Sequence, residues 1–277
     1  MQKMTGQKWQ CRIAPSLGGG FAGNPYDCWG VKEYKDENAP TVFMGLYSLK
    51  DFMVLNNHKG RRAVFFCGSD IRHLRDGYWL DDKGEIRIPP TPIARWINDN
   101  CESWCENDIE QSALRSLGIE SKICPSFLGD VNKFYASFKP GNKAYSSVSG
   151  DDFKLYGWDR IEEIAAQNPD LEIHLFGNIK EWKTDNSNVK VHGRVSQERF
   201  DKETREMQGA LRLVEFEGFS EIVAKSLLWG QYPVSAIKYP HTLNISEIRD
   251  ILGKKQPNLE GRKWVLDNVN KFPWNTK

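Results

Sequence analysis

A strand, loop, helix and strand pattern in the last third of the chain constrains the fold most. It is carried by the stretch LRLVEFEGFSEIVAKSLLWGQYPVS. The apolar residues 210–214 predict a strand, and the spacing of Ile222, Val223 and Leu227 predicts a helix that ends at Gly230. A second short strand is expected after that glycine. This βαβ pattern favours an α/β protein with parallel sheets.

The loop 215–220 follows the carboxyl end of the first strand and precedes the amino end of the helix. Open α/β sheets bind ligands at this position, because free helix N–H groups and the helix dipole favour an anion. Gly218 lets the backbone approach a ligand closely. Glu217 offers a carboxylate to hydroxyl groups beside that anion. An anion next to a polyol suggests a nucleotide-sugar, and the alternative is a plain connection with solvated carboxylates.

The composition is that of a globular protein. The chain has 277 residues, enough for two domains, with 39% hydrophobic and 27% charged residues. A net charge of +1 predicts no global attraction to nucleic acid or to an anionic membrane. The sequence shows neither a transmembrane run nor the apolar core of a signal peptide, so a cytoplasmic location is expected. Six cysteines are expected to be reduced, and Cys101 with Cys105 lacks the second pair of a zinc site, so no metal is predicted.

The first half of the chain predicts one α/β series. Strands are expected at 9–14, 41–44, 63–67 and 123–125, with helices at 26–34, 48–57, 71–74 and 108–117 and a loop or hairpin at 81–92. A glycine-rich loop follows the first strand, and its Gly19 and Gly20 are candidates for a phosphate cradle. Asp70 ends a strand, where it is either a helix cap or an acceptor-side residue.

The second half predicts another series after a linker at 127–143. Strands are expected at 143–148, 172–176 and 189–192, and helices at 156–166, 197–207 and 260–269. The predicted domains are therefore 1–127 and 128–255, with the C-terminal helix of 256–277 packing back on the first domain. Two facing domains of this kind form a cleft between their strand ends.

The order of motifs resembles GT-B glycosyltransferases, especially glycosyltransferase family 4. Residues 156–237 carry the resemblance through YGWDRIEEIAAQNPDLEIHLFG, NVKVHGRVS and EGFSEIVAKSLLWGQYPVS. The first half matches more loosely, through FFCGSDI and the segment END…SLGIESKICPSF. The resemblance implies a GT-B fold of two facing Rossmann-like domains with a donor and acceptor cleft between them.

The resemblance also implies roles for individual residues. Glu217 would bind sugar hydroxyls, and Lys225 and Arg194 join it as the residues expected to carry the chemistry. The expected donor-binding residues are Gly19, Gly20, Lys154, Tyr156, Gly177, Gly193, Arg194, Val195, Gly218, Phe219 and Ser220. Two positions depart from the family pattern, because Lys225 replaces the second glutamate and Tyr156 replaces a lysine.

Together these features predict a metal-independent transferase with a nucleotide-diphosphate sugar donor, of UDP type, and with retention at the anomeric carbon. No cofactor is expected. The acceptor is a glycan or small hydroxylated molecule, or alternatively a hydroxylated DNA base whose phosphates would meet the basic loop with Arg61 and Arg62. A non-catalytic nucleotide-sugar or glycan-binding module is the alternative of another class, suggested by Lys225 and Tyr156. A nucleotide-sugar epimerase is a third reading, without an evident acid and base pair.

Overall fold

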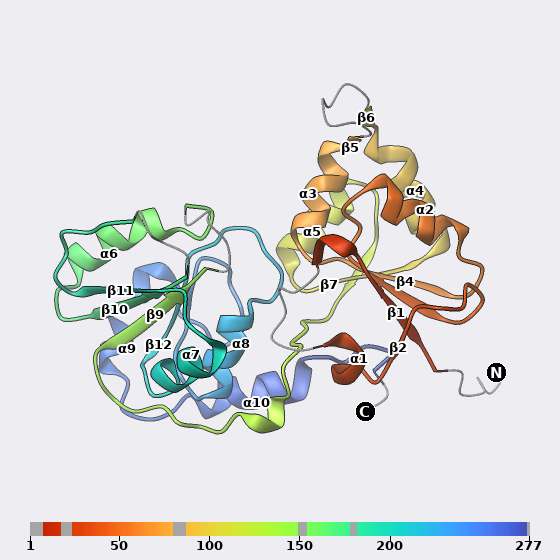
Figure 1. Ribbon diagram of the computed structural model, residues 1–277. Helices are drawn as coiled ribbons and strands as arrows, with labels where there is room; N and C mark the ends of the chain where they lie inside the picture. Colours follow the sequence, from red (N-terminus) through yellow and green to blue (C-terminus); the bar gives the residue numbers. More distant parts are fainter. Residues whose placement is uncertain (1–7, 18–23, 80–86, 149–153, 178–181, 276–277) are drawn as a thin grey trace. The chain divides into compact units, whose positions relative to one another are not determined.

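The computed structural model describes residues 8–17, 24–79, 87–148, 154–177 and 182–275, and these form two compact units (Figure 1). Unit 1 comprises residues 1–130, 216–219 and 268–277, and unit 2 comprises 131–215 and 220–267. Of the segment 256–277, residues 268–277 belong to unit 1, whereas the helix before them clusters with unit 2. The glycines 19 and 20 lie outside the described residues.

Unit 1 is built on a six-stranded parallel sheet with the order β2-β1-β3-β4-β7-β8. Its strands are β1 (Gln10–Ile13), β2 (Lys32–Glu33), β3 (Thr41–Met44), β4 (Arg62–Phe65), β7 (Glu102–Cys105) and β8 (Ser121–Ile123). Its helices are η1 (Pro15–Leu17), α1 (Pro25–Cys28), α2 (Leu49–Asn57), α3 (Ser69–Asp76), α4 (Pro90–Asn100) and α5 (Asp108–Ser116). A separate antiparallel pair joins β5 (Tyr78–Trp79) to β6 (Arg87–Ile88).

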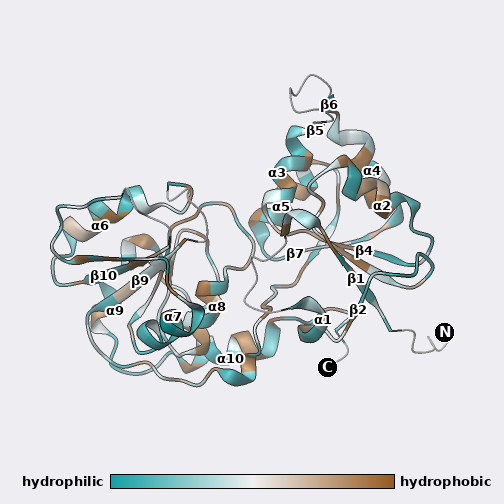
Figure 2. Cartoon of the chain, in the orientation of Figure 1, coloured by the Kyte–Doolittle hydropathy of each residue, from teal (hydrophilic) through white to brown (hydrophobic). Residues whose placement is uncertain are grey.

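Both faces of this sheet are buried, so its central strands are apolar throughout rather than alternating. Phe43 and Val64 point to one face, where they pack with apolar residues of α2, α3, α4 and α5. Their neighbours Val42 and Phe65 point to the other face, where they pack with residues of α1 and with Phe272 and Trp274. The helices around this sheet carry both brown, apolar and teal, polar residues (Figure 2).

An aromatic cluster closes the second face of unit 1. Trp274 is fully buried and stacks on Phe272 with 4.6 Å between ring centroids. Its ring also meets Trp104 at 5.5 Å and Trp29 at 6.0 Å. Phe272 and Trp274, near the C-terminus, are therefore part of the core of unit 1.

Unit 2 is built on a five-stranded parallel sheet with the order β11-β10-β9-β12-β13. Its strands are β9 (Lys143–Ser147), β10 (Glu172–Phe176), β11 (Val189–Gly193), β12 (Gly209–Arg212) and β13 (Val234–Ser235). Its α-helices are α6 (Ile161–Gln167), α7 (Gln197–Thr204), α8 (Glu221–Leu228), α9 (Asp250–Gly253) and α10 (Leu259–Asn268), the last ending at the junction with unit 1. Short turns of 3-10 helix are η2 (Val131–Lys133), η3 (Trp158–Arg160) and η4 (Ile245–Glu247).

Helices cover both faces of the second sheet as well. Ile173 and Leu175 face a core that includes Trp158 and Ile161, from η3 and α6. Tyr145 faces the opposite core, with Phe200, Trp229 and other residues from the α7 and α8 side. The α/β prediction is confirmed in both units. None of the helices in the described ranges is long and apolar enough to cross a membrane.

Two local predictions in the first half were wrong. Residues 26–34 were expected as one helix, but α1 ends at Cys28 and β2 begins at Lys32. The loop expected at 81–92 extended too far, because α4 begins at Pro90. Proline fits the first helical turn, where its missing N–H group has no intrahelical role.

Candidate functional site

The order of the strands marks one candidate ligand edge in each unit. In unit 2 the order reverses between β9 and β12, so connections leave these neighbours in opposite directions. In unit 1 the same reversal lies between β1 and β3. Ligands of open parallel sheets bind outside the carboxyl ends of the strands at such a reversal. The chain that follows β12 contains the predicted donor loop 215–220.

The central part of this loop, residues 216–219, belongs to unit 1 and is held there by side chains that follow β7. The Phe219 amide donates to Oε2 of Glu106 at 3.0 Å. The side-chain amide of Asn107 donates to the carbonyl oxygen of Glu217 at 2.6 Å. Asn107 also caps α5, because its Oδ1 accepts from the Glu110 amide at 2.9 Å. One short segment therefore caps a helix and binds the predicted donor loop.

Gly218 is required for this contact. A Cβ atom at this position would overlap Oε2 of Glu106 and lie 3.3 Å from Oε1 of Glu110. The sequence predicted that Gly218 permits a close approach, and here the approaching group is a carboxylate of the protein. Gly68 lies on the other side, and its left-handed backbone, with φ of 86°, favours glycine.

Three carboxyl groups are buried around this loop and at the carboxyl ends of β4 and β7. Burial raises the pKa of Asp70 to about 6, despite amide donors from Leu46, Cys67 and Ile71. Burial likewise raises the pKa of Glu106 to about 7, against the hydrogen bonds from Ser126 and Phe219. Burial and the neighbouring Glu106 raise the pKa of Glu110 well above its ordinary value. Oε1 of Glu110 finds no hydrogen-bond partner among the described residues.

The predicted nucleobase contacts in unit 2 come together at the ends of β10 and β11. The Gly177 amide donates to the Gly193 carbonyl at 2.9 Å, and both glycines have positive φ, of 136° and 68°. Among the described residues, the nearest atom to the Cβ position of Gly193 is the Gly177 carbonyl oxygen, at 4.0 Å. Arg194, directly after it, is exposed, and Val195 packs at the edge of the apolar cluster around Phe200.

The predicted donor residues near β9 and β12 form a separate group in unit 2. The Arg212 guanidinium lies 4.6 Å from the ring centroid of Tyr156 and donates to the Ser147 carbonyl at 3.2 Å. Lys154 is exposed just before Tyr156. Ser220 is the N-cap residue of α8, and its side chain makes no capping hydrogen bond within the described ranges.

Lys225 lies inside unit 2, although it is charged. Its side chain is 6% exposed, and its ammonium lies 3.2 Å from Oδ1 of Asp201, which is 34% exposed. The ammonium also lies 5.9 Å from the ring centroid of Phe200. The charge that the sequence assigned to the reacting centre is therefore already balanced by an ion pair between α8 and α7.

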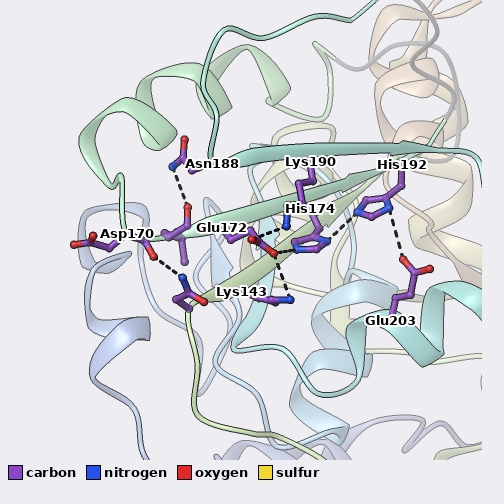
Figure 3. Close-up of polar contacts among 10 residues, drawn as sticks. Lys143, Asp170, Glu172, His174, Asn188, Lys190, His192 and Glu203 are labelled. Carbon is purple, nitrogen blue, oxygen red and sulfur yellow. Dashed lines mark hydrogen bonds and ion pairs between the residues drawn. The ribbon is translucent and has the colours of Figure 1, made fainter.

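A chain of polar contacts crosses β9, β10, β11 and α7 (Figure 3). The two imidazoles of His174 and His192 are joined by a contact of 2.9 Å between Nδ1 and Nε2. Nε2 of His174 meets Glu172 at 2.6 Å, and Glu203 lies 3.7 Å from Nδ1 of His192. The hydrogen bond from Lys190 holds the pKa of Glu172 down to about 2, with a further contribution from His174.

The basic loop assigned to the acceptor side lies away from the carboxyl ends of the strands in unit 1. Arg61 and Arg62 stand at the start of β4, whereas Asp70 follows its end. Arg61 pairs with Glu102, and Arg62 donates to the carbonyl oxygen of His58. The structure therefore does not bring the two arginines together with Asp70.

Of the predicted residues that the structure describes, Asp70 and Glu217 to Phe219 share the loop region of unit 1. Arg61 and Arg62 lie elsewhere in unit 1, and the others belong to unit 2. Glu106, Glu110 and Asp201 were missed as site residues. Their burial and pairing depend on distant contacts, although the N-cap spacing of Asn107 and Glu110 is visible in the sequence. Within the described ranges, no three His, Cys, Asp or Glu side chains are placed to hold a metal ion.

Comparison with known protein families and curated proteins finds no match. Among solved structures, a mutant of S. aureus TarM in complex with fondaparinux, α-GlcNAc-glycerol and UDP aligns with a TM-score of 0.57 and 12% identity. The alignment covers 84% of this chain and 53% of that one. The pneumococcal O-GlcNAc transferase GtfA, in complex with UDP and GlcNAc, gives 0.54 and 9% over 83% and 54% of the two chains.

Sucrose-phosphate synthase from Thermosynechococcus elongatus gives a TM-score of 0.58 and 12% identity, over 83% of this chain and 69% of that one. This chain thus spans about half the length of the S. aureus and pneumococcal proteins. At these identities the comparison describes the fold. The two units with parallel, Rossmann-like sheets make up a GT-B fold.

Proposed function

We propose that the protein is a glycosyltransferase that moves a sugar from a nucleotide-diphosphate donor, of UDP type, to a hydroxyl acceptor. The observation that carries this proposal is the glycine-containing loop between β12 and α8, with Glu217 in it, at the strand-order reversal of a GT-B fold. Support comes from the fold shared with TarM and GtfA, whose structures contain UDP. Retention at the anomeric carbon is part of the proposal by family resemblance.

In this mechanism Glu217 binds hydroxyl groups of the donor sugar, and the amides of Gly218, Phe219 and Ser220 bind the sugar or the diphosphate. The nucleobase lies near Gly177 and the segment 193–195. Charge that develops on the leaving diphosphate requires cations or amides aimed at it. Arg194 and Lys154 are the better candidates for that role, because both are exposed while Lys225 is paired with Asp201.

The proposed acceptor is a glycan or another small hydroxylated molecule. Asp70 accepts three backbone N–H groups and is completely buried, which is typical of a structural cap. The alternative of a hydroxylated DNA base gains no support, since Arg61 and Arg62 already have partners in unit 1.

A binding module without catalysis is the second candidate, and the Lys225–Asp201 pair favours it. Lys225 takes the position where the resembling family has a glutamate, and its burial fixes an ammonium there. A module of this kind binds a nucleotide-sugar and leaves it intact.

Thermal shift with uridine, guanosine, adenosine and thymidine diphosphates and their sugars tests the proposal. A ligand at 100 times its dissociation constant adds about 2.7 kcal/mol to the free energy of unfolding, which is readily detected. Transfer is then assayed with the stabilising sugar donor and a panel of hydroxyl acceptors. We expect Glu217→Ala to abolish transfer, whereas Glu215→Ala, in the same loop, retains it because Glu215 is exposed and pairs with Arg160.

Three results separate the candidates. Transfer that depends on Glu217 supports the enzyme. A thermal shift with a nucleotide-sugar supports the module if that donor also stays intact in every acceptor assay. Transfer at the wild-type rate by Glu217→Ala would contradict the proposed role of this residue.

A further inference from the structure

The contact between Glu106 and the loop 216–219 uses a group that the proposed donor also needs. Glu106 lies directly after β7, at the carboxyl edge of the sheet of unit 1. One of its oxygens, Oε2, accepts from the Phe219 amide at 3.0 Å. The other, Oε1, accepts from the amide and the hydroxyl of Ser126 at 2.9 and 2.6 Å. An anionic oxygen of the protein therefore accepts the hydrogen bond of an amide in the loop.

We propose that the Glu106 carboxylate is an internal competitor of the donor. The carboxylate accepts the hydrogen bond of the Phe219 amide until a nucleotide-diphosphate sugar displaces it. This inference rests on the proposed function and adds a means of regulation at the same site. The Glu106 carboxylate stands in for a donor oxygen, because both are anionic acceptors of backbone N–H groups. We call the Glu106–Phe219 contact the carboxylate lock.

The geometry around Gly218 favours competition between Glu106 and the donor over a purely structural role of Glu106 in holding the loop. Oε2 of Glu106 lies where the Cβ atom of any other residue at position 218 would stand. The space that a glycine leaves for a close ligand is thus filled by the carboxylate. A donor oxygen bound to the Phe219 amide requires the same space, so the two cannot be bound together.

The charges around Glu106 make the lock easy to release. Acidic groups and thiols surround Glu106 from α3, α5, the loop, β7 and the ends of β4 and β8. The described residues that interact with it electrostatically, either directly or through one another, are Cys67, Asp70, Cys105, Glu110, Cys124 and Glu217. The carboxylates in this group disfavour the ionised form of Glu106, and so does burial. A bound diphosphate adds negative charge. Donor binding should therefore be accompanied by proton uptake.

The experiment measures UDP binding by calorimetry for wild type, Glu106→Gln, Glu106→Asp and the control Glu120→Gln. Glu106→Gln removes the charge, and Glu106→Asp keeps it but withdraws the oxygen from Phe219. Glu120 is an exposed residue of the same unit, so its variant reports any general effect of losing a surface charge. Thermal unfolding identifies any variant that fails to fold, and the remaining Glu106 variant then decides the outcome.

We expect both Glu106 variants to bind UDP about tenfold more tightly at about pH 8, because a hydrogen bond to a charged group contributes about 1.5 kcal/mol or more. We also expect the gain to shrink toward about pH 6, where the wild-type carboxyl group becomes protonated. Comparison of variant with wild type at each pH cancels the titration of UDP itself. Glu120→Gln should match wild type throughout.

The lock has a readout that needs no ligand. The backbone amide resonance of Phe219 should titrate with pH in wild type and lose that titration in Glu106→Gln. UDP binding of equal or lower affinity in both Glu106 variants would overturn the inference while leaving the proposed function intact. Absence of UDP and other nucleotide binding in every variant would refute the proposed function and the competition together, whatever the Phe219 titration shows.

Discussion

Replacement of Trp274 by alanine should destabilise unit 1 strongly. The side chain is fully buried among Trp9, Trp29, Trp104 and Phe272. A tryptophan buries about 200 Å², and about 25 cal/mol per Å² gives about 5 kcal/mol. The buried indole N–H has no partner among the described residues, which offsets about 1–3 kcal/mol of that gain. We therefore expect Trp274→Ala to lower the free energy of unfolding by about 3 kcal/mol.

Urea unfolding measures the loss of stability, and hydrogen exchange of peptides from each unit shows where it occurs. Peptides from β3 and β4 should lose protection, whereas those from β9 and β10 should keep it. Tyr135→Ala is the control, because that residue is 58% exposed. Trp274→Phe should cost less than Trp274→Ala, since it keeps a ring and removes the unpartnered N–H group. A loss below about 1 kcal/mol for Trp274→Ala, a size typical of ordinary substitutions, would refute the reasoning.

Two further predictions concern unit 2. Asp201→Asn should cost about 3–5 kcal/mol, because it leaves the buried ammonium of Lys225 unpaired. Lys225→Met should cost less, since the Asp201 carboxylate that it leaves is partly exposed to water. Thermal unfolding measures both losses, and equal losses would contradict this account. The control is Asp267→Asn, in an exposed helical pair with Lys263, which should change stability by less than about 0.5 kcal/mol. Burial lowers the pKa of His174, so the unfolded state binds more protons and the free energy of unfolding should fall as pH drops below about 6.5. His174→Gln should flatten this dependence of the urea midpoint between about pH 7.5 and pH 5.5, whereas His73→Gln at an exposed site should preserve it.

Strands that are buried on both faces were the most predictable elements. β3 and β10 have the predicted limits, because runs such as TVFM and EIHLF have no other stable environment than a covered parallel sheet. The helix α4 was missed because its first turn reads Pro-Thr-Pro, which is also typical of a loop. Short polar or proline-containing segments have several compatible environments, and only tertiary packing selects one.

The candidate site was less predictable than the fold. The sequence identified the loop with Glu217 and Gly218 through its position between a strand and a helix. No local pattern indicates that Glu106 faces this loop, because Glu106 and Phe219 are 113 residues apart along the chain. Lys225 was read as a reacting charge, but its partner Asp201 lies on another helix. Partners of buried charges are set by packing, which a local pattern does not contain.

The return of residues 268–277 to unit 1 has a consequence for folding kinetics. The indole of Trp29 donates to Asn270 across 241 residues of sequence. Contacts between distant residues slow folding, because the entropy of closing a long loop is lost before the contact forms. Unit 2 lies largely within that loop, and most of its own contacts are nearer in sequence. We therefore expect unit 2 to reach its native state first in refolding, with the aromatic cluster of unit 1 completed in the slowest phase.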